Sequence, residues 1–210
     1  MDIEALINEI CDLEWTMFDK VNNAGGRASC QQHPDFFRKM RKCQFVNWNE
    51  ELLESYFEDL KSAEASGRNL LTEKYAWMMS WTHPEEFERI RSLLPVISEE
   101  KRDLVSSIVS AQVAWEEQVD RAYPYMRSGG RRLRQDRVKD RSTSFETYLA
   151  GELMTYSEET LRRYASWVQT LLEQGLNMAL MVAESTALAY GYKNLDDAEK
   201  SARERIVGNQ

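Results

Sequence analysis

The stretch that decides the fold is NEELLESYFEDLKSAEASGRN at residues 49–69, because its pattern returns as SEETLRRYASWVQTLLEQGLN at residues 157–177. At this constant offset of 108, the identical pairs between residues 37–69 and 145–177 are Phe37/Phe145, Glu50/Glu158, Glu51/Glu159, Leu53/Leu161, Tyr56/Tyr164, Gly67/Gly175 and Asn69/Asn177. Chance would give roughly two identities in such a window, so the sequence indicates a duplicated structural unit. Two like units usually pack about a pseudo-two-fold axis, and we expect a cleft at their seam.

Apolar residues recur at spacings of three and four along nearly the whole chain, which predicts an all-α fold. We expect one domain over residues 1–210, with four-helix units at about 2–81 and 99–192. A linking helix at about 83–94 and a last helix at about 195–206 complete it. Gly67 and Gly175 are expected to end helices, and Asn69 and Asn177 to begin the next ones. Capping boxes are expected at Thr82–Glu85 and Thr143–Glu146.

The formal net charge of −8 argues against a general nucleic-acid or anionic-membrane binder, because cations dominate phosphate affinity. No run of 18 apolar residues and no signal peptide is readable, so we expect a cytoplasmic protein. The three cysteines, an odd number confined to the first half, are expected to be free thiols.

Residues 127–141 form a basic segment, with six arginines and one lysine against two aspartates. Its glycines and its length would let it close as a lid over an anionic ligand. A mobile surface loop resting on the acidic remainder of the chain is the alternative, and the sequence leaves both open.

Several carboxylates lie on otherwise apolar helical faces, where an unpaired charge would be costly. The candidates are Glu184, Glu73, Glu14 and Glu152. Glu184 is the single charged residue between Met178 and Tyr190, which predicts a buried helix there. Cations must converge on these groups, and Arg27 and Arg131, which follow matching glycine pairs, are the expected suppliers.

The loop at residues 25–34 gathers polar groups ahead of a helix, a place suited to anions. Cys30 with His33 nearby is a candidate nucleophile and base, and a bystander thiol is the alternative. Arg27 would anchor a carboxylate or phosphate of a ligand, with Gln31 beside it. Trp48 and its counterpart Tyr156 would line the cleft, and Tyr148 is a further candidate for binding the substrate.

Metal sites find little support in the sequence. A di-iron carboxylate site needs two Glu-x-x-His pairs, and the two histidines follow Cys30 and Ser80 at that spacing. Glu51, Glu54 and Glu58 have spacing usable for magnesium, as all-α nucleotide pyrophosphatases require, but a solvated helix face is the alternative. No cofactor motif is present, and we expect no metal or cofactor.

Several motifs together resemble a bacterial family filed as domain of unknown function 4125. They are Gly25-Gly26-Arg27-Ala28-Ser29-Cys30-Gln31, Trp48-Asn49-Glu50-Glu51, Gly67-Arg68-Asn69-Leu70, Thr72-Glu73-Lys74-Tyr75-Ala76, Thr143-Ser144-Phe145-Glu146-Thr147-Tyr148-Leu149 and Tyr190-Gly191-Tyr192. The resemblance covers nearly the whole chain but implies no established activity. It implies one partner, a nucleotidyltransferase-like protein.

These observations favour binding, and metal-independent acid/base transformation, of a small polar metabolite, amino-acid-like or phosphorylated, in the seam. Arg27 would anchor its anionic group, and Glu73, Glu152 and Glu184 its cationic or hydroxyl groups, one of them acting as general base. A non-enzymatic scaffold for a partner such as the nucleotidyltransferase-like protein is the alternative. A magnesium-dependent all-α nucleotide hydrolase is the second alternative, and whether the chain is an enzyme stays open.

Overall fold

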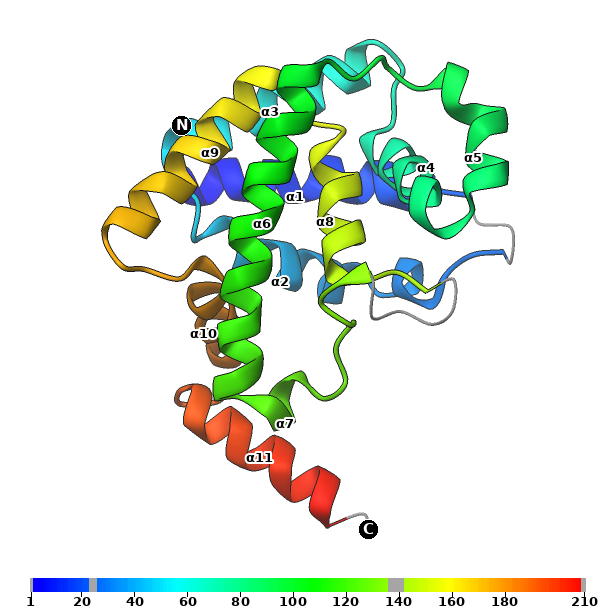
Figure 1. The fold of residues 1–210 in the computed structure, drawn as a ribbon. Coiled ribbons are helices and arrows are strands. Elements are labelled where there is room, and N and C mark those ends of the chain that lie inside the picture. The colour runs from blue at the N-terminus through cyan, green and yellow to red at the C-terminus, as the bar shows by residue number, and fades with distance from the viewer. Residues whose placement is uncertain (1, 23–25, 136–141, 209–210) are drawn as a thin grey trace.

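The computed structural model describes residues 2–22, 26–135 and 142–208, and this part of the chain contains helices and no strand (Figure 1). The all-α prediction is therefore confirmed. The helices are α1 (Ile3–Asp19), α2 (Pro34–Phe45), α3 (Glu50–Ala65), α4 (Leu70–Thr82), α5 (Pro84–Ile90), α6 (Glu99–Ala122), α7 (Pro124–Arg127), α8 (Phe145–Leu153), α9 (Glu158–Glu173), α10 (Met178–Ala189) and α11 (Leu195–Val207). Two 3₁₀ turns, η1 (Ser29–Gln32) and η2 (Arg91–Leu93), accompany them.

The repeated stretch ends its helices as the sequence predicts. Gly67 and Gly175 take φ values of +71° and +67°, a conformation that L side chains rarely adopt. The side chain of Asn69 accepts a hydrogen bond from Thr72 N, and that of Asn177 accepts one from Leu180 N, both at 2.9 Å. These joints turn α3 into α4 and α9 into α10 at equivalent places.

The two predicted capping boxes are wrong in detail. Ser144, not Thr143, caps α8, and its hydroxyl accepts from Thr147 N at 3.0 Å. Thr82 ends α4 instead of opening α5, and no side chain caps α5. Pro84 at the first position of α5 removes one of the N–H groups that have no partner at a helix start.

The helices of the two halves make equivalent contacts. Helix α1 contacts α2, α3 and α4, and α6 contacts α8, α9 and α10 in the same roles. Across the seam α3 packs on α9, α4 on α8, and α2 on α10. In Figure 1 α6 runs down the front, with α9 and α10 on its left and α4 and α5 on its right. A duplicated unit predicts this pairing, and the pseudo-two-fold relation itself stays a prediction.

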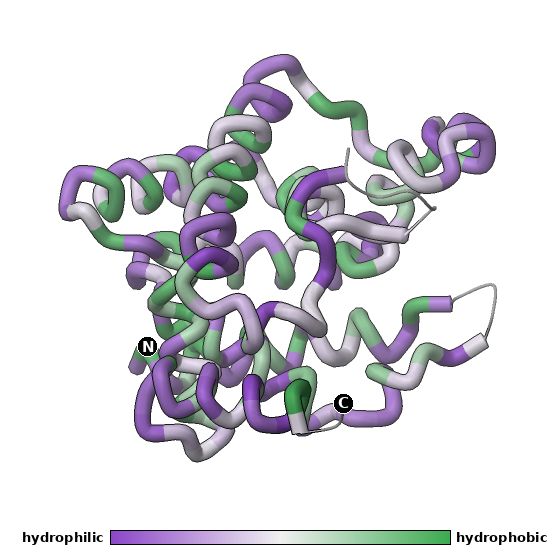
Figure 2. The backbone as a smooth tube through the Cα atoms, turned by 60° about the horizontal axis from the view of Figure 1, so that its bottom comes forward, coloured by the Kyte–Doolittle hydropathy of each residue, from purple (hydrophilic) through white to green (hydrophobic). Residues whose placement is uncertain are grey.

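One large hydrophobic cluster fills the space between these helices. Phe45, Leu52, Leu60, Leu161 and Leu171 are among its fully buried members. Figure 2 shows how hydrophobic and hydrophilic positions alternate along the helices. The connection from α5 to α6 departs from this pattern, because apolar Leu93 and Val96 are 81% and 97% exposed there.

The carboxyl-terminal helix α11 extends below the main bundle in Figure 1 and contacts α7 and α10. Its apolar contact is a separate small cluster of Ala187, Leu195 and Ala198. The Glu199 carboxylate also accepts hydrogen bonds from Tyr125 N at 2.9 Å and Met126 N at 2.7 Å. Helix α11 is thus attached mainly through the first turn of α7.

Helices α4 and α8 approach closely because residue 151 is glycine. A Cβ atom there would lie 2.6 Å from Met78 Cγ and 2.9 Å from the backbone oxygen of Lys74. The backbone of α4 cannot yield as a flexible side chain could, so the missing side chain sets the spacing of these two helices.

Gly151→Ala should therefore lower the free energy of unfolding by about 1–3 kcal/mol, because the added methyl group overpacks the α4–α8 contact. Gly129→Ala is the matched control, since a Cβ at residue 129 meets nothing within 4 Å. Urea unfolding followed by circular dichroism measures both. Equal stability of the two variants would contradict the close approach.

Candidate functional site

Four charged side chains from four helices meet at the seam. Arg41 of α2 donates to Glu14 of α1 through Nε at 2.6 Å and Nη2 at 2.5 Å, and its Nη2 also lies 3.0 Å from Oε1 of Glu152 on α8. Lys74 of α4 donates to the other oxygen of Glu152 at 2.5 Å. All four groups are buried or nearly so, with side-chain exposures of 14% for Arg41 and 8% or less for the others. We call them the seam network.

Two tyrosines and a glutamine complete the seam network. The hydroxyl of Tyr56 donates to Glu14 at 2.6 Å, and that of Tyr156 donates to Glu152 at 3.0 Å. The remaining Nη1 of Arg41 donates to Gln44 at 2.7 Å. Two positive and two negative charges thus balance, and each has its partners inside the protein.

The electrostatics of the seam network favour this ionisation state. Burial alone would raise the pKa of Glu152, but the charges of Arg41 and Lys74 outweigh it and hold that pKa well below its usual range. Burial and the neighbouring Glu14 raise the pKa of Tyr56 well above its ordinary value. Burial and Glu152 do the same for Tyr156. Both phenols therefore stay protonated and act as donors.

The second half carries a neutral counterpart of one corner of the seam network. Asn69 donates to Met17 O and Asn177 donates to Trp115 O, which aligns α1 with α6. In this alignment Gln112 of α6 takes the place of Glu14. Its amide donates to the hydroxyl of Tyr164 at 3.3 Å, and Tyr164 is the repeat partner of Tyr56. At this corner a neutral amide of the second half thus replaces the carboxylate of Glu14.

The structure brings together several of the residues predicted for the site. Glu14 and Glu152 are buried as expected, and Tyr156 binds Glu152 directly. The ring of Tyr148 lies beside them, with Lys74 Nζ 3.5 Å and Arg131 Cζ 4.5 Å from its centroid.

The predicted source of the cations is wrong. Arg27 pairs with Asp19 and also donates to Gln31 O at 3.0 Å, and Arg131 stacks on Tyr148. Arg41 and Lys74, which sequence reasoning missed, take the place of these two. The sequence contains a signal for both buried cations, since each lies on an apolar helical stripe. Arg41 lies four residues from both Phe37 and Phe45, and Lys74 lies four residues from both Leu70 and Met78.

The expectation of a buried Glu184 is also wrong, since the side chain is exposed and α10 is only partly buried. Met178, Ala179 and Ala187 are the buried residues of this helix. Glu73 is half-buried rather than buried, and it forms a bidentate pair with Arg68 at 2.7 and 2.8 Å. Neither carboxylate belongs to the seam network.

The thiols of the chain are free, as expected. Burial, reinforced by the charge of Glu14, raises the pKa of Cys11 to about 12, so that thiol is unreactive. Cys43 is buried and donates to Ser185 O at 3.6 Å. Cys30 alone is exposed.

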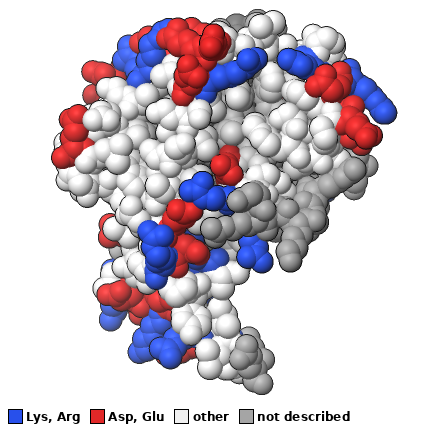
Figure 3. All heavy atoms as spheres, in the orientation of Figure 1, with Lys and Arg blue, Asp and Glu red and all other residues white. Residues whose placement is uncertain are grey.

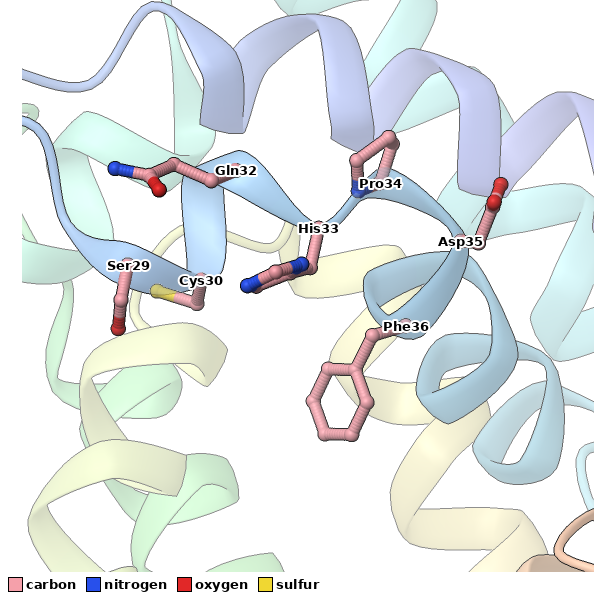
Figure 4. Close-up of a pocket in the computed structure, with 7 residues that line it drawn as sticks. All are labelled: Ser29, Cys30, Gln32, His33, Pro34, Asp35 and Phe36. Carbon is pink, nitrogen blue, oxygen red and sulfur yellow. The ribbon is translucent and has the colours of Figure 1, made fainter.

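Cys30 and His33 line an open hollow of about 540 Å³ together with Ser29, Gln32, Pro34 and Phe36. Figure 4 shows the thiol of Cys30 pointing away from the imidazole of His33, and no hydrogen bond between the two is found in the described residues. The predicted Cys30–His33 pair is therefore not assembled here. Gln31 is buried instead, and its amide donates to Phe18 O and Val21 O, so it ties η1 to the end of α1.

A larger cavity, of about 860 Å³, lies where α10 faces α11 and α7. We call it the α10–α11 cavity. Its size reflects small side chains at a spacing of four, Ala179, Ala183 and Ala187 on α10 and Ala198 and Ala202 on α11. Met40 of α2 also lines it, so the cavity reaches the seam between the halves.

The charged groups of this cavity are Glu116, Arg127 and Arg205. Arg127 pairs with Glu116 at 3.1 Å, and both side chains are largely buried. Burial raises the pKa of Glu116, and Arg127 offsets this in part. The Nε atom of Arg127 is buried, and none of the described residues accepts its hydrogen bond. Such donors are rare in folded proteins. In the described residues the Nε1 atoms of Trp48 and Trp77 share this property, and Arg127 is the one of the three that lines the α10–α11 cavity.

The basic segment is only partly described, because residues 136–141 lie outside the described residues. Its first residue, Arg127, ends α7, and in the turn that follows Gly130 N donates to Arg127 O at 2.8 Å. In Figure 3 acidic and basic side chains gather side by side where α7 meets the end of α6. The lid and the surface loop both stay predictions.

The fold and the seam network together define an all-α protein whose core contains a cluster of buried, paired charges. A family model described as protein of unknown function (DUF4125) matches residues 4–200, and the chain belongs to this family. The resemblance seen in the sequence is thereby confirmed. No curated protein and no solved structure matches the chain.

Two further findings concern metals and membranes. Within residues 2–22, 26–135 and 142–208, no three His, Cys, Asp or Glu side chains come together as a metal site. Glu51, Glu54 and Glu58, the residues considered for magnesium, are exposed on α3. No helix in the same part of the chain is both long and apolar enough to cross a membrane.

Replacing Glu152 by Gln should destabilise the protein by about 3 kcal/mol, because Arg41 and Lys74 then face each other across a neutral amide. Glu58→Gln is the control: its exposed pair with Lys61, at 3.4 Å, should contribute within about 0.5 kcal/mol. Chemical denaturation of both variants measures the difference. A Glu152→Gln protein as stable as the control would show that the seam network is not a stabilising element.

The depressed pKa of Glu152 also predicts a pH dependence. In the unfolded chain a glutamate titrates near pH ~4.3, so the unfolded state binds the proton first. The contribution of ionised Glu152 to the free energy of unfolding is fully present above the unfolded-state pKa and declines as the pH falls toward the folded-state pKa. The free energy of unfolding between pH 7 and 3 should therefore drop more steeply for wild type than for Glu152→Gln. Parallel curves would contradict the assignment.

Proposed function

We propose that the protein binds a small amphipathic molecule with an anionic group in the α10–α11 cavity. The observation that carries this is the cavity itself, whose largely apolar wall includes the cationic Arg127, with a buried Nε that has no acceptor among the described residues. The volume of about 860 Å³ lies within the usual range for small-molecule sites.

The lining supports an apolar body for the ligand. Alanines of α10 and α11, together with Val119, Val182 and Met126, belong to its apolar wall. Tyr125, Tyr190 and Tyr192 add rings with polar tips. The binding energy would come mainly from burying apolar surface, and Arg127 would orient the anionic end.

The seam network is a weaker candidate for holding a ligand. Each of its charges already has partners inside the protein, so a polar metabolite would have to displace an ion pair to bind there. For this reason the proposed ligand is amphipathic and not the small polar metabolite that the sequence suggested. Acid/base roles for Glu73, Glu152, Glu184 or Cys30, and the nucleotidyltransferase-like partner, stay predictions.

Two fluorescent probes with the same rings test the proposal. The anion 8-anilinonaphthalene-1-sulfonate should bind wild type more tightly than neutral N-phenyl-1-naphthylamine. Ala183→Trp, which fills the cavity, should weaken both probes about tenfold or more. Ala114→Trp is the control, because Ala114 is exposed on α6 and does not line the cavity.

A second variant separates charge from shape. Arg127→Gln combined with Glu116→Gln removes the ion pair without leaving a buried charge. It should lower the affinity for the sulfonate about tenfold, the value of one charge-assisted hydrogen bond, and leave the neutral probe unchanged. Circular dichroism checks that each variant is folded. If a folded Ala183→Trp protein bound the sulfonate as wild type does, the proposed cavity would be wrong.

A further inference from the structure

A second hollow, of about 550 Å³, adjoins the α10–α11 cavity and is polar where the cavity is apolar. Four arginines line it, Arg121, Arg127, Arg131 and Arg132, and we call it the arginine hollow. Arg127 and Ser128 line both spaces, so the two meet at the residue whose Nε has no acceptor in the described part of the chain. A molecule that occupies the cavity can therefore reach the hollow with its polar end.

The charges of the arginine hollow are not balanced. Arg127 has its partner in Glu116, and the acidic Glu117 of the wall has its own in Arg134 at 2.7 Å. No carboxylate among the described residues pairs with Arg121, Arg131 or Arg132, and Asp120 is the one other acidic residue of the lining. The hollow thus has an excess of two positive charges.

Contacts hold two guanidinium groups of the arginine hollow, that of Arg131 on the ring of Tyr148 and that of Arg127 against Glu116. Arg131 stacks on the ring of Tyr148, with 4.5 Å between Cζ and the centroid. Arg127 folds back over Gly130, where a Cβ atom would lie 3.7 Å from its Cζ. Guanidinium groups held in this way lose less entropy when they bind an anion.

We infer that the anionic group of the ligand is a phosphate or diphosphate ester, held by Arg127, Arg131 and Arg132. A phosphate ester carries close to two negative charges at pH 7 and three acceptor oxygens, which matches the excess charge and the several donors. A carboxylate carries one charge and would leave a cation uncompensated. This inference rests on the proposed function and names the class of its ligand: an apolar body bearing a phosphate.

The test is displacement of 8-anilinonaphthalene-1-sulfonate by octyl phosphate and by nonanoate, which carry the same eight-carbon alkyl chain and are used below their micelle concentrations. At pH 7.5 wild type should prefer octyl phosphate by about tenfold. Arg131→Gln with Arg132→Gln should abolish that preference and leave nonanoate unchanged. Arg89→Gln, an exposed arginine on α5 outside both spaces, is the matched control.

The outcomes separate this inference from the function it rests on. A double variant that keeps the preference for octyl phosphate overturns the phosphate assignment, while a cavity that still binds the sulfonate leaves the proposed function standing. Equal displacement by the two amphiphiles in wild type also overturns the phosphate assignment. Sulfonate binding that Ala183→Trp does not weaken overturns the proposed function itself.

Discussion

The guanidinium group of Arg41 binds a carboxylate from each half of the chain, and the arrangement of the bundle depends on it. Glu14 precedes it on α1 and Glu152 follows it on α8, while Lys74 fixes the second oxygen of Glu152. Buried charges are costly without partners, so sliding one of these helices past another would expose an unpaired charge to an apolar core. The seam network therefore fixes the register of four helices more strictly than apolar packing alone.

Two equivalent pairs of helices cross the seam, α4 with α8 and α2 with α10, and they differ in the residues at their contacts. At the offset of 108, Leu149 stands where the first half has Arg41, and Val182 where it has Lys74. Gly151 allows close approach of α4 and α8, whereas its counterpart Cys43 lies between α2 and α10. The contact between α4 and α8 is consequently close and polar. The contact between α2 and α10 is apolar, and the α10–α11 cavity lies beside it.

Local signals predicted most of the fold, because caps and helix ends depend on neighbouring residues. Asn69 and Gly67 illustrate this, and the burial of Glu14 and Glu152 followed from their apolar neighbours. Their cations could not be identified as easily, since long side chains such as Arg41 reach partners distant in sequence. The helix containing Glu184 misled because alanine is compatible with a core, a surface or a cavity wall, and here it forms a wall. The cavity itself depends on how α11 docks, which no local pattern determines.

Helix α11 docks through few contacts, and this bears on how the cavity would respond to a ligand. Its attachment consists of a small apolar cluster and the bonds from Glu199 to the backbone of α7. A molecule in the α10–α11 cavity would add apolar contact between α10 and α11 and an acceptor for Arg127 beside α7. Because these contacts exist only when α11 is docked, binding would strengthen the docking by the free energy they contribute. Within the described residues the charges of the seam network all have partners, whereas the region around α11 has unfilled space and one buried donor, the Nε of Arg127, without an acceptor.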